Sequence, residues 1–148
     1  MKMQRSAGIL LPVSSLPSPY GIGGFSQEAY DFVDWLKEAG QTYWQILPLG
    51  VTSYGDSPYQ SFSAFAGNPY FISLDELVKE GVLTAEECKK AKFGRKADDI
   101  DYSQLYKERG RLLRLAYSRS DIGHNAAFAA FCEKNKWWLD DFALFMAV

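Results

Sequence analysis

The residues best suited to chemistry lie in one long segment, positions 50–70, with the sequence GVTSYGDSPYQSFSAFAGNPY. It carries hydroxyls, amides and aromatic rings, and its single charged residue is Asp56. A sugar ring has an apolar C–H face that can lie on a tyrosine, and hydroxyls that need short polar partners. Pro58 fixes its own φ and restricts Ser57 to extended geometry, so Ser57 and Tyr59 should be held rigidly. The segment is therefore suited to bind a neutral, polyhydroxylated ligand. The same residues are also consistent with a rigid loop whose aromatic side chains pack against the rest of the protein.

The other residues that could take part in chemistry are better explained by structural roles. The stretch GIGGFS (21–26) nearly matches a dinucleotide-binding fingerprint, but it ends in Ser26 and lacks the tight strand-to-helix turn, which favours a structural loop. His124 is the only histidine, lies in a polar stretch, and is expected at the surface or at a helix cap. Cys88 and Cys132 lie in helical patterns and should be buried or semi-buried thiols. One histidine and two distant cysteines do not make a metal site.

Bulk composition limits the possible partners. The 148 residues suffice for one domain with a core, and 47% of them are hydrophobic. A net charge of −2 and a pI of about 5.4 argue against nucleic acid. The sequence shows neither a membrane span nor a signal peptide, and its two cysteines fit a reducing cytoplasm. The final residues, WWLDDFALFMAV, read as an amphipathic helix without a cap, so the chain is expected to be a fragment of a longer protein.

The first part of the chain has the pattern of a strand–helix–strand unit. The apolar run 6–13 predicts a buried strand, and the run 42–49 predicts a second one. A helix should begin after Ser26, end before Gly40, and present one apolar face, formed by Ala29, Phe32, Val33 and Leu36. The two strands should be parallel, so the loop 50–70 leaves the sheet edge at which ligands bind in α/β folds.

The rest of the chain reads as helical. Residues 69–81 predict a short strand and a helical turn, and TAEE (84–87) has capping-box spacing. A helix should begin near Asp101, with one face formed by Tyr102, Leu105, Tyr106, Arg109, Leu113, Ala116 and Tyr117. A last helix should run from Asn125 to the end, with a break near Asn135.

Three stretches closely resemble a known family. They are GILLPVSSLPSPYGIGGF, YWQILPLG and YGDSPYQSFSAFAGNPY, and they resemble the N-terminal portion of 4-alpha-glucanotransferases, the amylomaltases and disproportionating enzymes of glycoside hydrolase family 77. The resemblance is dense over residues 5–80, and beyond it only DIDYSQLY is similar. It implies an α/β fold, the N-terminal part of a (β/α)8 TIM barrel with a mostly helical inserted subdomain. Residues 1–74 would hold the first βαβ unit and the loop 50–70, and residues 75–148 the helical insertion.

The resemblance also implies an activity. Such enzymes transfer segments of α-1,4-glucan to the 4-hydroxyl of an acceptor glucan or glucose by a retaining double displacement. An Asp acts as nucleophile, a Glu as acid/base, and a further Asp orients the ring. These carboxylates lie on later barrel strands, so no catalytic residue is expected within the 148 residues, and the chain alone is expected to be inactive.

What carries over to this chain is a set of binding residues. By resemblance, Ser57 and Tyr59 line subsites beside the catalytic centre. The residues expected to brace the loop are Asp56, Gln60 and Asn68, and Asp56 should do so by hydrogen bonds to backbone amides. Tyr54 and Tyr102 resemble a second glucan-binding platform away from the centre.

The implied partners are α-1,4-glucans, that is, maltodextrins and starch- or glycogen-like chains, without a cofactor. An incomplete barrel also exposes strand edges and apolar faces, which favours self-association. Two alternatives stay open: a non-catalytic α-glucan-binding module derived from the same barrel, and a hydrolase of similar fold.

Overall fold

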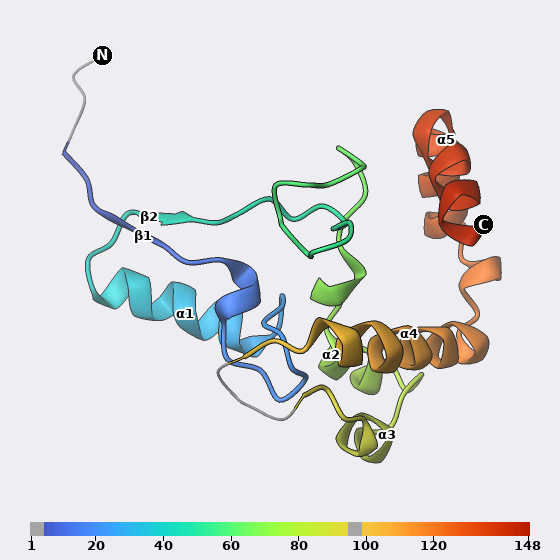
Figure 1. Ribbon diagram of the computed structural model, residues 1–148, viewed down its shortest axis with the longest axis horizontal. Coiled ribbons are helices and arrows are strands. Elements are labelled where there is room, and N and C mark those ends of the chain that lie inside the picture. The colour runs from blue at the N-terminus through green and yellow to red at the C-terminus, as the bar shows by residue number, and fades with distance from the viewer. Residues whose placement is uncertain (1–4, 95–98) are drawn as a thin grey trace.

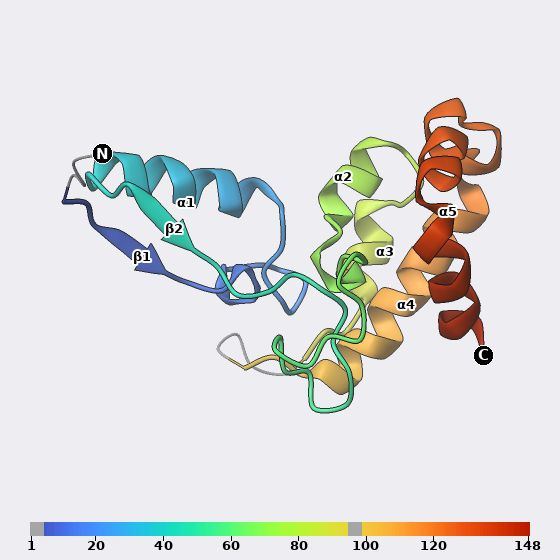
Figure 2. The same ribbon diagram turned by 90° about the horizontal axis from the view of Figure 1, so that it is seen from above.

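The computed structural model describes residues 5–94 and 99–148 (Figure 1). Strand β1 (Gly8–Leu10) pairs in parallel with β2 (Tyr43–Gln45), and the register places Ile9 opposite Trp44. Helix α1 (Gln27–Glu38) connects them and lies along one side of the pair (Figure 2). The predicted parallel strand–helix–strand unit is therefore confirmed.

The ends of α1 follow the local sequence signals. Ser26 is the N-cap residue, although its hydroxyl donates to the Glu28 carboxylate rather than accepting from the helix. Gly40 follows the helix with φ +69°, a conformation that glycine adopts at low cost. Ala29 and Leu36 are buried, whereas Val33 is exposed. The prediction that Val33 belongs to the buried face was wrong, because two short strands cover only a narrow stripe of α1.

Both strands are shorter and more exposed than the sequence predicts. Each has three residues, and the Leu10 side chain is 56% exposed, so the prediction of a buried strand over residues 6–13 was wrong for this chain. A two-stranded sheet has two open edges, and within residues 5–94 and 99–148 no third strand joins the sheet to bury them. Trp44 lies on the side of the strand pair that α1 covers. Its indole nitrogen donates to the Leu11 carbonyl at 2.8 Å, and its ring contacts Phe32 of α1.

Helices dominate the remainder of the described chain. They are α2 (Leu74–Lys79), α3 (Ala85–Lys90), α4 (Tyr102–Arg119) and α5 (Ala126–Ala147), with short 3-10 turns at Val13–Ser15, Pro69–Phe71 and Ile122–His124. The strand predicted within residues 69–81 is absent. The segment forms a 3-10 turn and α2 instead, since Asn68 and Ser73 each accept a hydrogen bond as an N-cap.

The predicted capping box at α3 is confirmed, because Thr84 and Glu87 each bond the other's backbone amide. Helix α4 begins after Asp101, whose carboxylate accepts from the Gln104 amide at 3.0 Å. Its buried residues are Leu105, Arg109, Leu112 and Ala116.

The predicted face of α4 needs a correction. Tyr106 and Tyr117 are exposed, and Leu112 takes the buried place assigned to Leu113. The apolar residues of α4 spread over more than one face, and contact with α2 and α3 selects the one that is buried.

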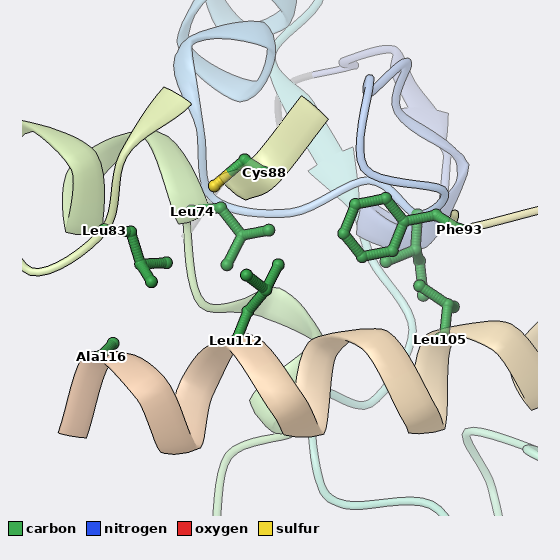
Figure 3. Packing of buried hydrophobic residues seen from close by; sticks show 8 residues of the cluster. Leu74, Leu83, Cys88, Phe93, Leu105, Leu112 and Ala116 are labelled. Carbon is green, nitrogen blue, oxygen red and sulfur yellow. The ribbon is translucent and has the colours of Figure 1, made fainter. Parts of the chain in front are cut away.

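Two groups of buried residues hold the chain together. The larger joins α2, α3 and α4, with Leu74, Leu83 and Cys88 facing Leu105 and Leu112 (Figure 3). The smaller lies between α1 and the strand unit and contains Val13, Leu16 and Ala29. Phe71 packs against both groups, so the end of the loop 50–70 lies where they meet.

Helix α5 stands at the far end of the molecule (Figure 1). It runs through Asn135 without the predicted break, since the Asn135 amide donates to the Phe131 carbonyl at 2.8 Å within the helix. Its length and apolar content do not make it a membrane span, nor do those of any other helix in the described ranges.

Candidate functional site

Backbone pairing between the outgoing and returning parts of the loop 50–70 orders it. Gly50 pairs with Gly67, and Thr52 pairs with Ser61, both as isolated antiparallel bridges. The Asn68 amide donates to the Leu49 carbonyl at 2.9 Å. The loop therefore doubles back on itself and returns to its starting point.

Asn68 closes this base. It is buried, with 8% of its surface exposed, and its side-chain oxygen accepts from the Tyr70 amide at 2.9 Å. Its carbonyl accepts from the Phe71 amide at 3.0 Å. An aspartate in its place would put a charge in a largely dry position, so the neutral amide suits the site.

The turn at residues 53–56 uses left-handed backbone. Gly55 has φ +92° and Asp56 has φ +53°, a region in which Asp is one of the few tolerated non-glycine residues. The Asp56 amide donates to the Ser53 carbonyl at 3.0 Å, and its carboxylate accepts from the Thr52 hydroxyl at 3.1 Å. The prediction that this carboxylate bonds backbone amides was therefore wrong, because the turn brings Thr52 to it instead.

The next turn presents a tyrosine to solvent. The Gln60 amide donates to the Ser57 carbonyl at 3.1 Å, which closes a turn containing Pro58 and Tyr59. Tyr59 is 74% exposed and Tyr54 is fully exposed. Ser57 is half-buried and Gln60 is exposed. The two tyrosine faces are thus available to a ligand.

The other rings of the segment contact further aromatic rings, although Phe62 and Phe65 stay 43% and 58% exposed. Phe62 stacks near Phe142 and Phe145 of α5, at centroid separations of 6.3 and 5.4 Å. Phe65 meets Trp137 and Trp138 of the same helix at 4.7 and 5.7 Å.

At the end of the segment, Tyr70 lies 6.2 Å from Tyr102, and Phe71 lies 6.2 Å from Phe25. The two interpretations of the loop therefore apply to different rings. Tyr54 and Tyr59 fit a ligand-binding surface, whereas Phe62, Phe65 and Tyr70 contact other aromatic rings.

A small cavity lies under the loop. Its volume is about 40 Å³, and Asp56, Pro58, Asn68, Tyr70 and Tyr102 are among its lining residues. It has room for a water molecule but not for a sugar. The structure thus brings Asp56, Asn68 and Tyr102 together inside the base of the loop.

The remaining predicted residues, Tyr54, Ser57, Tyr59 and Gln60, do not line this cavity. Another hollow, of about 860 Å³, is lined by residues of the segments 14–23, 91–94 and 99–104, and none of the predicted site residues is among them.

The ionisable groups at the loop keep it neutral apart from Asp56. Burial raises the pKa of Tyr102 and of Tyr70, and the nearby Asp56 carboxylate raises both further. Both phenols therefore stay protonated at neutral pH and remain hydrogen-bond donors. Such a surface suits neutral hydroxyl-bearing ligands better than ions.

Outside the loop, the histidine and the two cysteines have the burial that the sequence predicts. His124 is exposed and bonds Asp121, Cys88 is buried, and Cys132 is half-buried. Within residues 5–94 and 99–148, no cluster of His, Cys, Asp and Glu could hold a metal ion. Gly21 and Gly23 allow close backbone packing against Phe93 and Val13, which is a structural role.

Two features of the site escaped the sequence interpretation. One is the attachment of Phe62 and Phe65 to α5, for which the apolar pair of tryptophans at 137–138 was the only signal. The other is Arg109, which is buried on α4 although its sequence position suggested only a member of an amphipathic face.

Comparison with known proteins identifies this architecture. The sequence profile of a family described as 4-alpha-glucanotransferase matches residues 11–148. Two relatives, both named 4-alpha-glucanotransferase, are 52% identical over 98% of this chain (Streptococcus pneumoniae) and 48% identical over all of it (Thermus thermophilus). The chain spans 29% of the length of each. A solved structure, "Amylomaltase from Streptococcus agalactiae in complex with acarbose", superposes with a TM-score of 0.88 at 42% identity, over 97% of this chain and 29% of the other.

The fold is thus that of the matching portion of an amylomaltase. The chain belongs to the 4-alpha-glucanotransferase family, of whose members it forms an N-terminal portion, as the resemblance predicted.

Proposed function

We propose that the complete protein containing this chain is a 4-alpha-glucanotransferase. It would move segments of α-1,4-glucan from a donor chain to the 4-hydroxyl of an acceptor glucan or glucose by a retaining double displacement. Membership of the family supports this activity, and the acarbose bound in the related amylomaltase supports a saccharide as ligand. The two free cysteines agree with a cytoplasmic setting.

The catalytic carboxylates would come from polypeptide beyond residue 148. A retaining mechanism needs two carboxyl groups roughly 5 Å apart, flanking the scissile bond. The loop offers only Asp56, which bonds the Thr52 hydroxyl and lies in the base of the loop. The 148-residue chain contributes binding surface, and we expect it to be inactive alone.

The exposed ring of Tyr59, on a turn stiffened by Pro58, is the single observation that carries the proposal. A tyrosine face held rigidly can stack on a glucose ring at little entropic cost. Beside it, Ser57 would supply a hydroxyl to a donor or acceptor subsite. Asp56, Gln60 and Asn68 would brace the loop.

A second saccharide platform would use Tyr54 and Tyr102. Tyr54 is fully exposed, whereas Tyr102 is half-buried and its ring contacts Tyr70. Tyrosine rings that are reachable from solvent can stack on the apolar faces of glucose units.

The strands are proposed as the first two of a (β/α)8 barrel. Their parallel pairing with α1 as the crossover supports this, and so does the exposure of Leu10 and Tyr43, which further strands would cover. The helices from α2 to α5 would then form the mostly helical insertion.

Incubation of the complete protein with maltotriose tests the proposal. A transferase yields glucose together with a ladder of longer maltodextrins. A hydrolase yields glucose and maltose without elongation, and a non-catalytic module binds the sugar without converting it. Either of the last two results would reject the proposal, and the 148-residue chain serves as the inactive control.

A further inference from the structure

Arg109 is the one charged residue among the buried side chains of α4. It lies between Leu105 and Leu112 on the face that packs against α2 and α3, and only 3% of its surface is exposed. Figure 3 shows this face, with Leu105 and Leu112 pointing into the apolar cluster. A guanidinium in such a place loses most of its hydration.

The hydrogen bonding of Arg109 is incomplete. One terminal nitrogen donates to the Ile72 carbonyl at 2.5 Å, while Nε is buried without a partner. Within residues 5–94 and 99–148, no carboxylate forms an ion pair with it. Burial lowers the pKa of Arg109 to about 10, so it remains charged at neutral pH. The charge is kept at a free-energy cost that an apolar side chain of similar length would avoid.

Within residues 5–94 and 99–148, the one hydrogen-bond partner of Arg109 is the Ile72 carbonyl, which lies where the loop 50–70 returns to the helices. Ile72 directly follows the 3-10 turn Pro69–Phe71, which Asn68 begins. Residues 67–72 form the stem on which the loop 50–70 returns to the helices. Helix α4 holds this stem twice, through the ring contact of Tyr102 with Tyr70 and through the hydrogen bond of Arg109 to Ile72.

We propose that Arg109 is a positioning residue, which fixes the stem of the loop and thereby the placement of Ser57 and Tyr59 toward a bound glucan. The inference rests on the proposed function, because the loop must bind saccharide for its placement to matter. A guanidinium suits the task, since a hydrogen bond from a charged donor to a carbonyl is stronger than one from a neutral donor. A residue kept only for stability would be better served by methionine at this position.

The test uses the complete protein with Arg109→Met, which keeps the length and apolar stem, and Arg109→Lys, which keeps one charged donor. Arg114→Met, at an exposed arginine of the same helix, is the matched control. We expect Arg109→Met to lower kcat/KM for maltotriose about tenfold, the cost of one lost bond to a charged donor. Its melting temperature should stay equal or rise, and amide hydrogen exchange should accelerate within residues 50–72 only. Arg109→Lys should restore part of the activity.

Two results would overturn the inference. One is an Arg109→Met protein with wild-type kcat/KM and wild-type exchange. The other is a variant that loses stability and activity together, or fails to fold, because Arg109 would then be an ordinary core residue. If the wild-type protein does not convert maltotriose, the proposed function fails instead. The exchange measurement then still decides whether Arg109 anchors the stem.

Discussion

Phe65 of the loop meets Trp137 of α5 edge-on, with 4.7 Å between their ring centroids. Trp138 lies on the same phenylalanine at 5.7 Å, and Phe62 stacks near Phe142. The far part of the loop is thus held by α5, while its stem is held by α4. A segment without regular structure becomes rigid because two helices fix it at separate points.

Replacing Phe65 with alanine should loosen this attachment. We expect a loss of about 1 kcal/mol in the free energy of unfolding, the value of an aromatic pair at a partly exposed site. Chemical denaturation followed by circular dichroism measures it. Tyr54→Ala removes a fully exposed ring of the same loop and should change stability by less than about 0.5 kcal/mol. Equal effects of the two variants would contradict the anchoring role of Phe65.

Tyr59→Ala should separate activity from stability in the complete protein. Tyr59 is 74% exposed, so its removal costs little folding energy, but it takes away the proposed stacking face. We expect kcat/KM on maltotriose to fall by at least about tenfold with an unchanged melting temperature. Tyr117→Ala, at an exposed tyrosine of α4, is the control. If stability and activity fell in parallel, Tyr59 would be a packing residue.

Local signals allowed much of the fold to be predicted. The parallel strand pair, the end of α1 at Gly40 and the capping box of α3 depend on neighbouring residues, and the structure confirms them. Features that depend on distant contacts were missed. The exposure of Leu10 depends on which strands pair with β1, and the choice of Leu112 over Leu113 depends on where α2 packs.

The same distinction applies to the candidate site. Composition indicated a ligand surface in the loop, and the stiffness of the turn at Pro58 followed from local rules. Which rings have packing partners could not be predicted from composition, because Phe62 and Phe65 contact a helix far along the chain while remaining partly exposed. The position of Arg109 escaped prediction for a related reason. Its hydrogen-bond partner, the Ile72 carbonyl, is a backbone atom that no side-chain pattern reveals.

Gly23→Ala tests the structural role of the glycine-rich stretch 21–26. A Cβ at Gly23 would lie 2.2 Å from the Val13 carbonyl oxygen, and backbone atoms cannot move aside cheaply. We expect a loss of more than about 2 kcal/mol in unfolding free energy. Gly123→Ala, where nothing lies within 4 Å of an added Cβ, should be nearly neutral. A Gly23→Ala protein as stable as Gly123→Ala would show that the close packing is unimportant.

The isolated 148-residue chain should self-associate. Leu10 and Tyr43 on the strands are more than half exposed, as are Leu144 and Phe145 on α5. Exposed apolar faces and open strand edges favour pairing between copies. Sedimentation velocity over a concentration series should show species larger than a monomer, and Leu10→Lys should reduce them. A monomer at every concentration would contradict the expectation.

Acid should weaken the contact between α3 and the end of α4. Arg119 donates to both oxygens of Glu87, at 2.9 and 2.7 Å, and this hydrogen bonding lowers the pKa of Glu87 from about 4.5 to about 2. A carboxyl group with a depressed folded-state pKa stabilises the protein fully above its unfolded value. That contribution is lost as the pH falls from about 4.5 to about 2.

Glu87→Gln keeps the helix-capping group but removes the charge. The difference in urea midpoint between wild type and this variant should therefore be largest above pH 4.5 and shrink as the pH falls toward 2, where the Glu87 carboxyl becomes protonated in the folded state as well. High salt should shrink the difference at neutral pH, since the pair lies at the surface. Glu86→Gln, at the exposed neighbouring residue, should show no such trend. A difference that stays constant from pH 7 to pH 2 would mean that Glu87 acts through its cap alone, and that the ion pair with Arg119 contributes nothing to stability.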